Sequence, residues 1–107
     1  MAISEGSGPT VILDDCEIRG IIAGHEVAPV FQPVVELGFG RPVGYEALAR
    51  GPVGSRLHGA PQLFAAAAAA GAVAELDAVC FEASLRRFES AGLAAPLLVN
   101  VDPAFLT

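Results

Sequence analysis

Apolar and polar positions along the chain predict a helix followed by a strand in its first third. Apolar residues recur at helical spacing after the capping pair Asp14-Asp15, which predicts a short helix over residues 16–23. Residues 28–37 are rich in β-branched side chains and indicate a strand. Pro33 cannot donate a ladder hydrogen bond, so this strand is expected at a sheet edge or with irregular pairing.

The next apolar run predicts a hairpin. Residues 38–42 (GFGRP) have the composition of a tight turn, and residues 43–50 read as a second strand. Two strands joined by so short a turn are expected to pair antiparallel. Residues 51–60 are loop by composition.

Two helices and a third strand complete the pattern. Residues 62–70 and 73–90 have strong helical propensity and periodicity, and Gly71 and Gly92 are placed to end them. The apolar run over residues 96–103 turns polar at its C-terminal end and reads as a strand. Because the connection from the second strand is long and helical, the second and third strands are expected to be parallel.

Charged side chains interrupt the second strand. Side chains two apart on a strand share a face, so Glu46, Leu48 and Arg50 would point the same way. Buried charges need a partner, a ligand or a metal, which makes this face a candidate site. The alternative is that Glu46 and Arg50 pair with each other or lie at an exposed strand end. In α/β folds ligands bind at the C-terminal ends of the strands, where Asn100 and Asp102 also lie.

Composition limits both the fold and the partners. The 107 residues allow one small domain, whereas a closed eight-fold α/β barrel needs about 250. The chain is 53% hydrophobic and 17% charged, which argues against intrinsic disorder. The net charge is −6 and there is no lysine, which argues against polymeric nucleic acid as a partner. Its six arginines could still grip a small anionic ligand.

The chain divides into a flexible lead over residues 1–13 and a domain over residues 14–107. No signal peptide is visible, and the longest apolar run, residues 63–70, is too short to span a bilayer. A cytoplasmic protein is therefore expected. Cys16 and Cys80 lie far apart without metal-ligand spacing, so both are expected to be buried free thiols.

Three motifs together resemble a known family. They are FQP at residues 31–33, GYEALAR at 44–50 and VNVDP at 99–103. In this order and spacing they look like the first part of an EAL domain, the bacterial cyclic-di-GMP phosphodiesterase, which is named after the triplet found here at 46–48. The resemblance implies a modified TIM-like (β/α)₈ barrel with an antiparallel first strand. The chain would hold about three of its strands with their helices.

The resemblance also implies site residues and chemistry. In the family, Mg²⁺ or Mn²⁺ supports hydrolysis of cyclic-di-GMP to the linear dinucleotide pGpG. By position in the motifs, the metal ligands would be Glu46 and Asn100, with Asp102 as a further candidate. The ligand phosphate would be clamped by Arg50, and the dinucleotide would contact Gln32 and Leu48. Hard divalent ions favour carboxylate and amide oxygens of this kind.

Each of these residues also has a purely structural interpretation. The Asn100 amide could satisfy backbone groups at a strand end, and Gln32 could face solvent on an edge strand. Asp102 stands where the family usually has serine, and it could cap the following turn. His25 and His58 fall in loops without metal-ligand spacing, and no role is assigned to them.

Departures from the family pattern leave the function open. The family completes its site with acidic residues on later strands and with a lysine, and this sequence has no lysine. The chain by itself is therefore expected to be inactive and to need the remainder of an EAL domain. The alternative is a degenerate, non-catalytic module that binds cyclic-di-GMP or acts by protein contact. A third interpretation is a short remnant that is stable only as a homo-oligomer.

Overall fold

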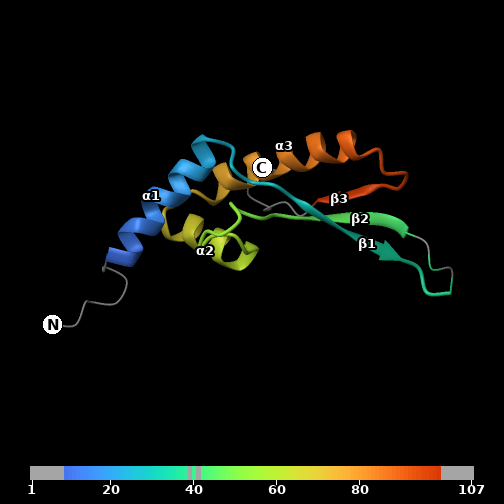
Figure 1. Cartoon of the computed structure of the whole chain (residues 1–107), viewed down its shortest axis with the longest axis horizontal. Coiled ribbons are helices and arrows are strands. Elements are labelled where there is room, and N and C mark those ends of the chain that lie inside the picture. The colour runs from blue at the N-terminus through green and yellow to red at the C-terminus, as the bar shows by residue number, and fades with distance from the viewer. Residues whose placement is uncertain (1–8, 39, 41, 100–107) are drawn as a thin grey trace.

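The computed structural model describes residues 9–38, 40 and 42–99, with side chains described from Asp14 onward. Within these ranges the chain is mixed α/β, with three helices and three strands. They follow in the order α1 (Pro9–Ala23), β1 (Val30–Val35), β2 (Pro42–Leu48), α2 (Ala60–Ala69), α3 (Val73–Ala91) and β3 (Leu97–Val99). Figure 1 shows α1 and α2 gathered at one end, the hairpin extending from the other, and α3 running along the sheet.

The three strands form one sheet in the order β1-β2-β3. β1 pairs antiparallel with β2 and β3 pairs parallel with β2, so the predicted hairpin and the predicted crossover are both confirmed. Within the described sheet β1 is an edge strand, as expected for a strand that contains Pro33. The register shift falls between Val34 and Val35, beside the proline.

Helix α1 begins earlier than predicted. It starts at Pro9, and Asp14 and Asp15 lie inside it, so they do not cap its first turn. Both carboxylates have cationic partners instead: Asp15 Oδ2 lies 3.1 Å from Arg19 Nε one turn later, and Asp14 Oδ1 lies 2.7 Å from Arg56 Nη2. Such contacts make a helix interior acceptable for aspartate.

Helices α2 and α3 lie close to their predicted ranges. The predicted segments 62–70 and 73–90 correspond to Ala60–Ala69 and Val73–Ala91. Gly92 takes a left-handed conformation (φ 64°) directly after α3, as a helix-ending glycine does. The crossover from β2 to β3 therefore consists of two helices and a loop.

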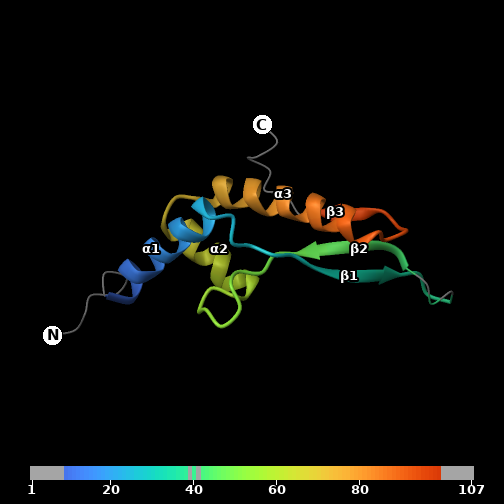
Figure 2. The same ribbon diagram turned by 45° about the horizontal axis from the view of Figure 1, so that its top comes forward.

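The core lies between the three helices. Its fully buried large side chains are Ile18 and Ile21 of α1, Leu63 of α2 and Leu76 of α3. Ala67 of α2 is also fully buried, and its small side chain allows α1 and α2 to pack closely. Figure 2 shows these two helices side by side at one end of the sheet.

Helix α3 covers one face of the sheet. The Phe88 ring meets Phe31 of β1 edge-on, with centroids 5.7 Å apart, and lies 6.4 Å from the Tyr45 ring of β2. Because side chains alternate along a strand, the residues between these positions point to the opposite face. On that face Val30 and Leu98 are each about half exposed, at 46% and 49%. The sheet thus has one face covered by α3 and one open face.

Candidate functional site

The sheet register brings Gln32 and Glu46 together. Gln32 of β1 lies directly opposite Glu46 of β2, and Leu98 of β3 is the partner of Glu46 on its other side. Opposite residues in an antiparallel pair share a face and have Cβ atoms about 5 Å apart. Gln32 is exposed and Glu46 half-buried, so a carboxylate and an amide are neighbours on the open face.

Leu48 and Arg50 continue this alternation beyond Glu46. Leu48 ends β2 opposite Val30, and it is half-buried. Although the assigned strand stops there, Arg50 and Ala28 still exchange two backbone hydrogen bonds, of 2.9 and 3.1 Å. This exchange is the pattern of opposite residues in an antiparallel ladder. Arg50 therefore keeps the strand register and follows Glu46 and Leu48 on the same side.

The Arg50 side chain makes a contact with its own main chain. Its Nη1 donates a 2.8 Å hydrogen bond to the carbonyl oxygen of Ala49, and the residue is half-buried. A guanidinium carries five N–H donors, so this one bond leaves donor capacity for a ligand. Arg50 thus has one contact with its own backbone, and whether it also pairs with Glu46 stays open.

Two predicted site residues, Asn100 and Asp102, lie outside the described residues. The described part of β3 ends at Val99, which pairs with Ala47 next to Glu46. Their assignment stays a prediction.

The loop after β2 places a residue that the sequence did not single out. His58 Nδ1 lies 2.9 Å from the Gly51 carbonyl oxygen, and the Gly51 N–H donates a 2.9 Å hydrogen bond to the His58 carbonyl oxygen. Gly51 is buried, and a Cβ there would collide with the Leu57 carbonyl oxygen. The sequence carries no signal for this contact, because a lone histidine in a glycine-rich loop has no periodicity or spacing.

Beneath the sheet, a small cavity of about 120 Å³ separates β2 and β3 from the helices. It is lined by side chains that include Asp77, Cys80 and Ser84 of α3. Asp77 and Ser84 are only 7% and 4% exposed. Burial, with a smaller contribution from the Asp77 carboxylate, raises the pKa of the Cys80 thiol to about 12. The thiol therefore stays protonated at neutral pH and is a poor nucleophile or metal ligand.

Both cysteines are free, as predicted, but they differ in burial. Cys80 is half-buried, whereas Cys16 is exposed on α1, contrary to the expectation that both thiols are buried. Cys16 lies outside the helical core because its position in α1 falls on the side away from Ile18 and Ile21.

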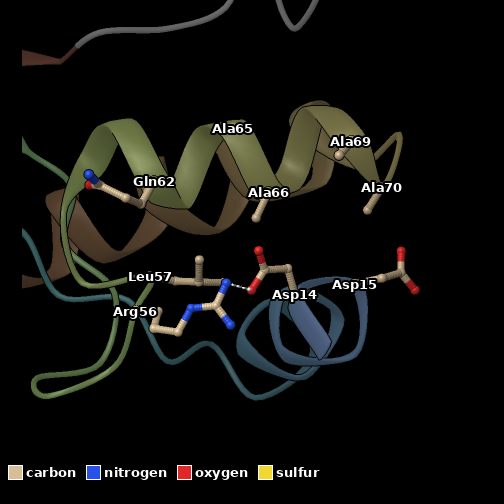
Figure 3. Close-up of a pocket in the computed structure, with 9 residues that line it drawn as sticks. All are labelled: Asp14, Asp15, Arg56, Leu57, Gln62, Ala65, Ala66, Ala69 and Ala70. Carbon is tan, nitrogen blue, oxygen red and sulfur yellow. Dashed lines mark ion pairs between the residues drawn. The ribbon is translucent and has the colours of Figure 1, made fainter. Parts of the chain in front are cut away.

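A larger cavity, of about 340 Å³, lies between α1 and α2, away from the open face. Figure 3 shows the side chains of Ala66 in α2 and of Ala70 directly after it on one side, and the ion pair of Asp14 with Arg56 on the other. None of the four predicted site residues that the structure describes, Gln32, Glu46, Leu48 and Arg50, lines it. This cavity is therefore not where the predicted chemistry lies.

The described part of the chain has neither a metal-ligand cluster nor a membrane-spanning helix. Within the described ranges, no three His, Cys, Asp or Glu side chains are grouped closely enough to hold a metal ion. No helix in those ranges has the length and hydropathy to cross a membrane.

Comparison with known proteins identifies the family. The EAL domain family matches the chain over residues 15–107, which includes every described strand and the loop that holds Arg50. No curated protein matches the chain. The match covers well over half of the sequence, so the chain belongs to the EAL domain family.

Proposed function

We propose that this chain forms the N-terminal part of an EAL barrel and contributes one side of a cyclic-di-GMP phosphodiesterase site. The observation that carries the proposal is the sheet register, in which Gln32 lies opposite Glu46 while Leu48 and Arg50 continue on the same side. These residues come from the family's motifs. Gln32 and Glu46 share the face that α3 leaves open, while Leu48, which also lines the small cavity beneath α3, and Arg50 follow at the carboxyl end of β2. In the completed barrel this face is the interior.

The donor chemistry on this face suits a hard divalent cation. Glu46 offers a half-buried carboxylate, and Gln32 offers an amide oxygen directly opposite it. Oxygen donors of these two kinds are the ones that Mg²⁺ and Mn²⁺ prefer. Glu46 is the proposed metal ligand, with Asn100 as a second ligand and Asp102 as a further candidate. When bound, the metal would activate water for attack at phosphorus.

Binding of the dinucleotide is assigned to Arg50, Gln32 and Leu48. The Arg50 guanidinium can grip a phosphate bidentately, exchanging its hydrogen bond with the Ala49 carbonyl for a charged partner. Leu48 supplies apolar contact at the end of β2, and the exposed Gln32 amide can donate to the ligand and accept from it. The positioned arginine holds the phosphate near Glu46, which is what an in-line displacement requires.

A second candidate is a module that binds cyclic-di-GMP without hydrolysing it. The sequence has no lysine, and the described residues offer no cluster of three metal-ligating side chains. Both observations favour binding over catalysis for the chain on its own. In this case Arg50 would still bind the ligand phosphate, whereas Glu46 would not hold a metal ion.

Calorimetric titration of the chain with cyclic-di-GMP and Mn²⁺ tests the ligand binding that both candidate functions predict. Arg50→Ala is expected to weaken binding about ten- to hundredfold, since a charged hydrogen-bonded pair contributes about 1.5–3 kcal/mol. Arg87→Ala, at an exposed position of α3, is the matched control and should leave the affinity unchanged. The family function does not apply to this chain if the wild type fails to bind.

Hydrolysis separates the two candidates. The chain alone is expected to leave cyclic-di-GMP intact, as followed by chromatography. Supplied with the later strands of an EAL barrel as a second polypeptide, it should release the linear dinucleotide, and Glu46→Gln should abolish that release. Binding without any release in the reconstituted pair would favour the non-catalytic module.

A further inference from the structure

The backbone on both sides of Arg50 is held by reciprocal hydrogen bonds. On one side, Arg50 exchanges two backbone bonds with Ala28. On the other, the N–H and C=O groups of Gly51 are both satisfied by His58: the N–H by the His58 carbonyl, and the C=O by the ring Nδ1, each at 2.9 Å. The main chain that carries the Arg50 side chain is therefore fixed from two directions.

The loop between these contacts is built to return His58 to Gly51. Within it, the Ser55 N–H donates to the Pro52 carbonyl at 3.1 Å, and Ser55 Oγ accepts from the Leu57 N–H at 3.1 Å. The His58 N–H then donates to the Ser55 carbonyl at 3.3 Å. A compact loop with adjacent ends and internal hydrogen bonds is a rigid platform. Its two ends meet at the residue directly after Arg50.

The histidine side chain supplies a bond that the loop backbone does not. Gly51 is buried, and a buried carbonyl without a donor is destabilising. Since a carbonyl oxygen can only accept, the ring nitrogen that faces it must carry the proton, so His58 is bound as the Nδ1–H tautomer or as the cation. The His58 ring thus holds the Gly51 main chain in place when the loop closes.

We propose that His58 is a positioning residue for Arg50, holding the adjacent main chain so that the guanidinium is set to receive a ligand phosphate. The proposal deepens the proposed function and rests on it for the identity of the ligand. His58 does not touch the ligand; it acts through Gly51. A misplaced donor loses much of its effect, because a charged hydrogen bond depends steeply on geometry.

Binding of cyclic-di-GMP by a set of variants tests this role. His58→Ala is expected to weaken binding about tenfold, and His58→Asn to restore most of the loss, because the asparagine amide can place an N–H near the position of Nδ1. In an Arg50→Ala background, His58→Ala should have no further effect. His25→Ala is the matched control, since that histidine is exposed and contacts Glu82 of α3, with Nδ1 3.4 Å from Oε1.

Three results would overturn the proposal. They are unchanged binding in His58→Ala, a loss that persists in the Arg50→Ala background, and a loss that His58→Asn does not restore. The position of the proton on the His58 ring can also be measured in the wild-type protein, where nitrogen NMR should show a protonated Nδ1. A predominant Nε2–H tautomer would contradict the contact without any variant.

Hydrogen exchange separates this role from the proposed function. Whether or not a ligand binds, His58→Ala should raise the exchange rate of the Gly51 amide about tenfold, and His58→Asn should return it toward the wild-type rate. If the wild type does not bind cyclic-di-GMP, the proposed function fails while this exchange result still supports the positioning of the Arg50 main chain. Unchanged exchange in His58→Ala would refute the positioning role itself.

Discussion

Gly51 shows how a single residue without a side chain can be required by the fold. The chain passes so close to the Leu57 carbonyl oxygen that a Cβ would collide with it, and a backbone oxygen cannot rotate away. Gly20, inside α1, has nothing within 4 Å of the place where a Cβ would lie. The two glycines therefore make a matched pair with opposite expectations.

We expect Gly51→Ala to lower the free energy of unfolding by about 1–3 kcal/mol, the range for forcing extra volume into a packed site. Gly20→Ala should raise it by about 0.5–1 kcal/mol, because alanine loses less backbone entropy in a helix. Urea denaturation of both variants measures the difference. Destabilisation by Gly20→Ala, or tolerance of Gly51→Ala, would contradict the packing described.

The two thiols provide a second prediction at this scale. The exposed Cys16 is expected to react with a thiol reagent at pH 8 in the folded protein, whereas Cys80 should react only on unfolding. Mass spectrometry after labelling identifies the modified residue. Rapid labelling of Cys80 in the native state would show that packing against the sheet does not cover this side of α3.

The raised pKa of Cys80 also predicts a pH dependence of stability. Its folded pKa of about 12 lies above the ordinary value of 9.0, so the native state holds the thiol proton more tightly than the unfolded chain does. The stability contributed by the protonated thiol is complete below pH 9 and is lost as pH rises from 9 toward 12. Chemical denaturation at pH 8 and pH 10.5 should show this loss in the wild type and a smaller one in Cys80→Ala.

Among the secondary-structure elements, helix α2 packs closely in the helical core because alanines with small side chains lie on its buried side. Ala67 is fully buried against the helical core, while its neighbour Ala68 is exposed. The same substitution at the two positions therefore tests which side of α2 is packed. A leucine at Ala67 has no space, and a leucine at Ala68 projects into solvent.

Ala67→Leu is expected to lower the free energy of unfolding by about 1–3 kcal/mol. Ala68→Leu should change it by less than about 0.5 kcal/mol, the usual range for a surface substitution. Thermal or urea unfolding compares them directly. Equal effects of the two variants would contradict the burial of Ala67 and the exposure of Ala68.

At the scale of the whole molecule, the open sheet face and the outer strand call for a partner. Within the described residues β3 pairs only with β2, and the open face carries Val30 and Leu98, each about half exposed. Apolar strands of this kind recruit another chain. The remainder of an EAL domain or a second copy of this chain would cover them.

The chain alone is therefore expected to self-associate, and Leu98→Lys to shift it toward monomer. Leu98 is preferred to Val99 for this test, because Val99 lines the cavity beneath α3 and a lysine there would unfold the protein. Val53→Lys, at a loop position that is 90% exposed, is the control. Light scattering on the eluting protein at tens of micromolar measures the mass. A compact wild-type monomer would show that no partner is needed.

Local periodicity is enough to predict the order of the helices and strands and the face on which several side chains lie. Apolar spacing placed Ile18 and Ile21 in the core, proline placed β1 at an edge, and strand alternation put Glu46 with Leu48 and Arg50 on one side. The family motifs then indicated which face carries chemistry.

Contacts between residues far apart in the chain are visible only in the folded structure. Asp14 and Asp15 look like caps in the sequence but lie inside α1, and Asp14 forms an ion pair with Arg56 from the loop after β2. Cys80 lies on the side of α3 that packs against the sheet and is half-buried, whereas Cys16 on α1 is exposed. His58 meets Gly51 because the loop closes on itself. Such contacts depend on distances in the folded chain, which a one-dimensional pattern of residue types does not contain.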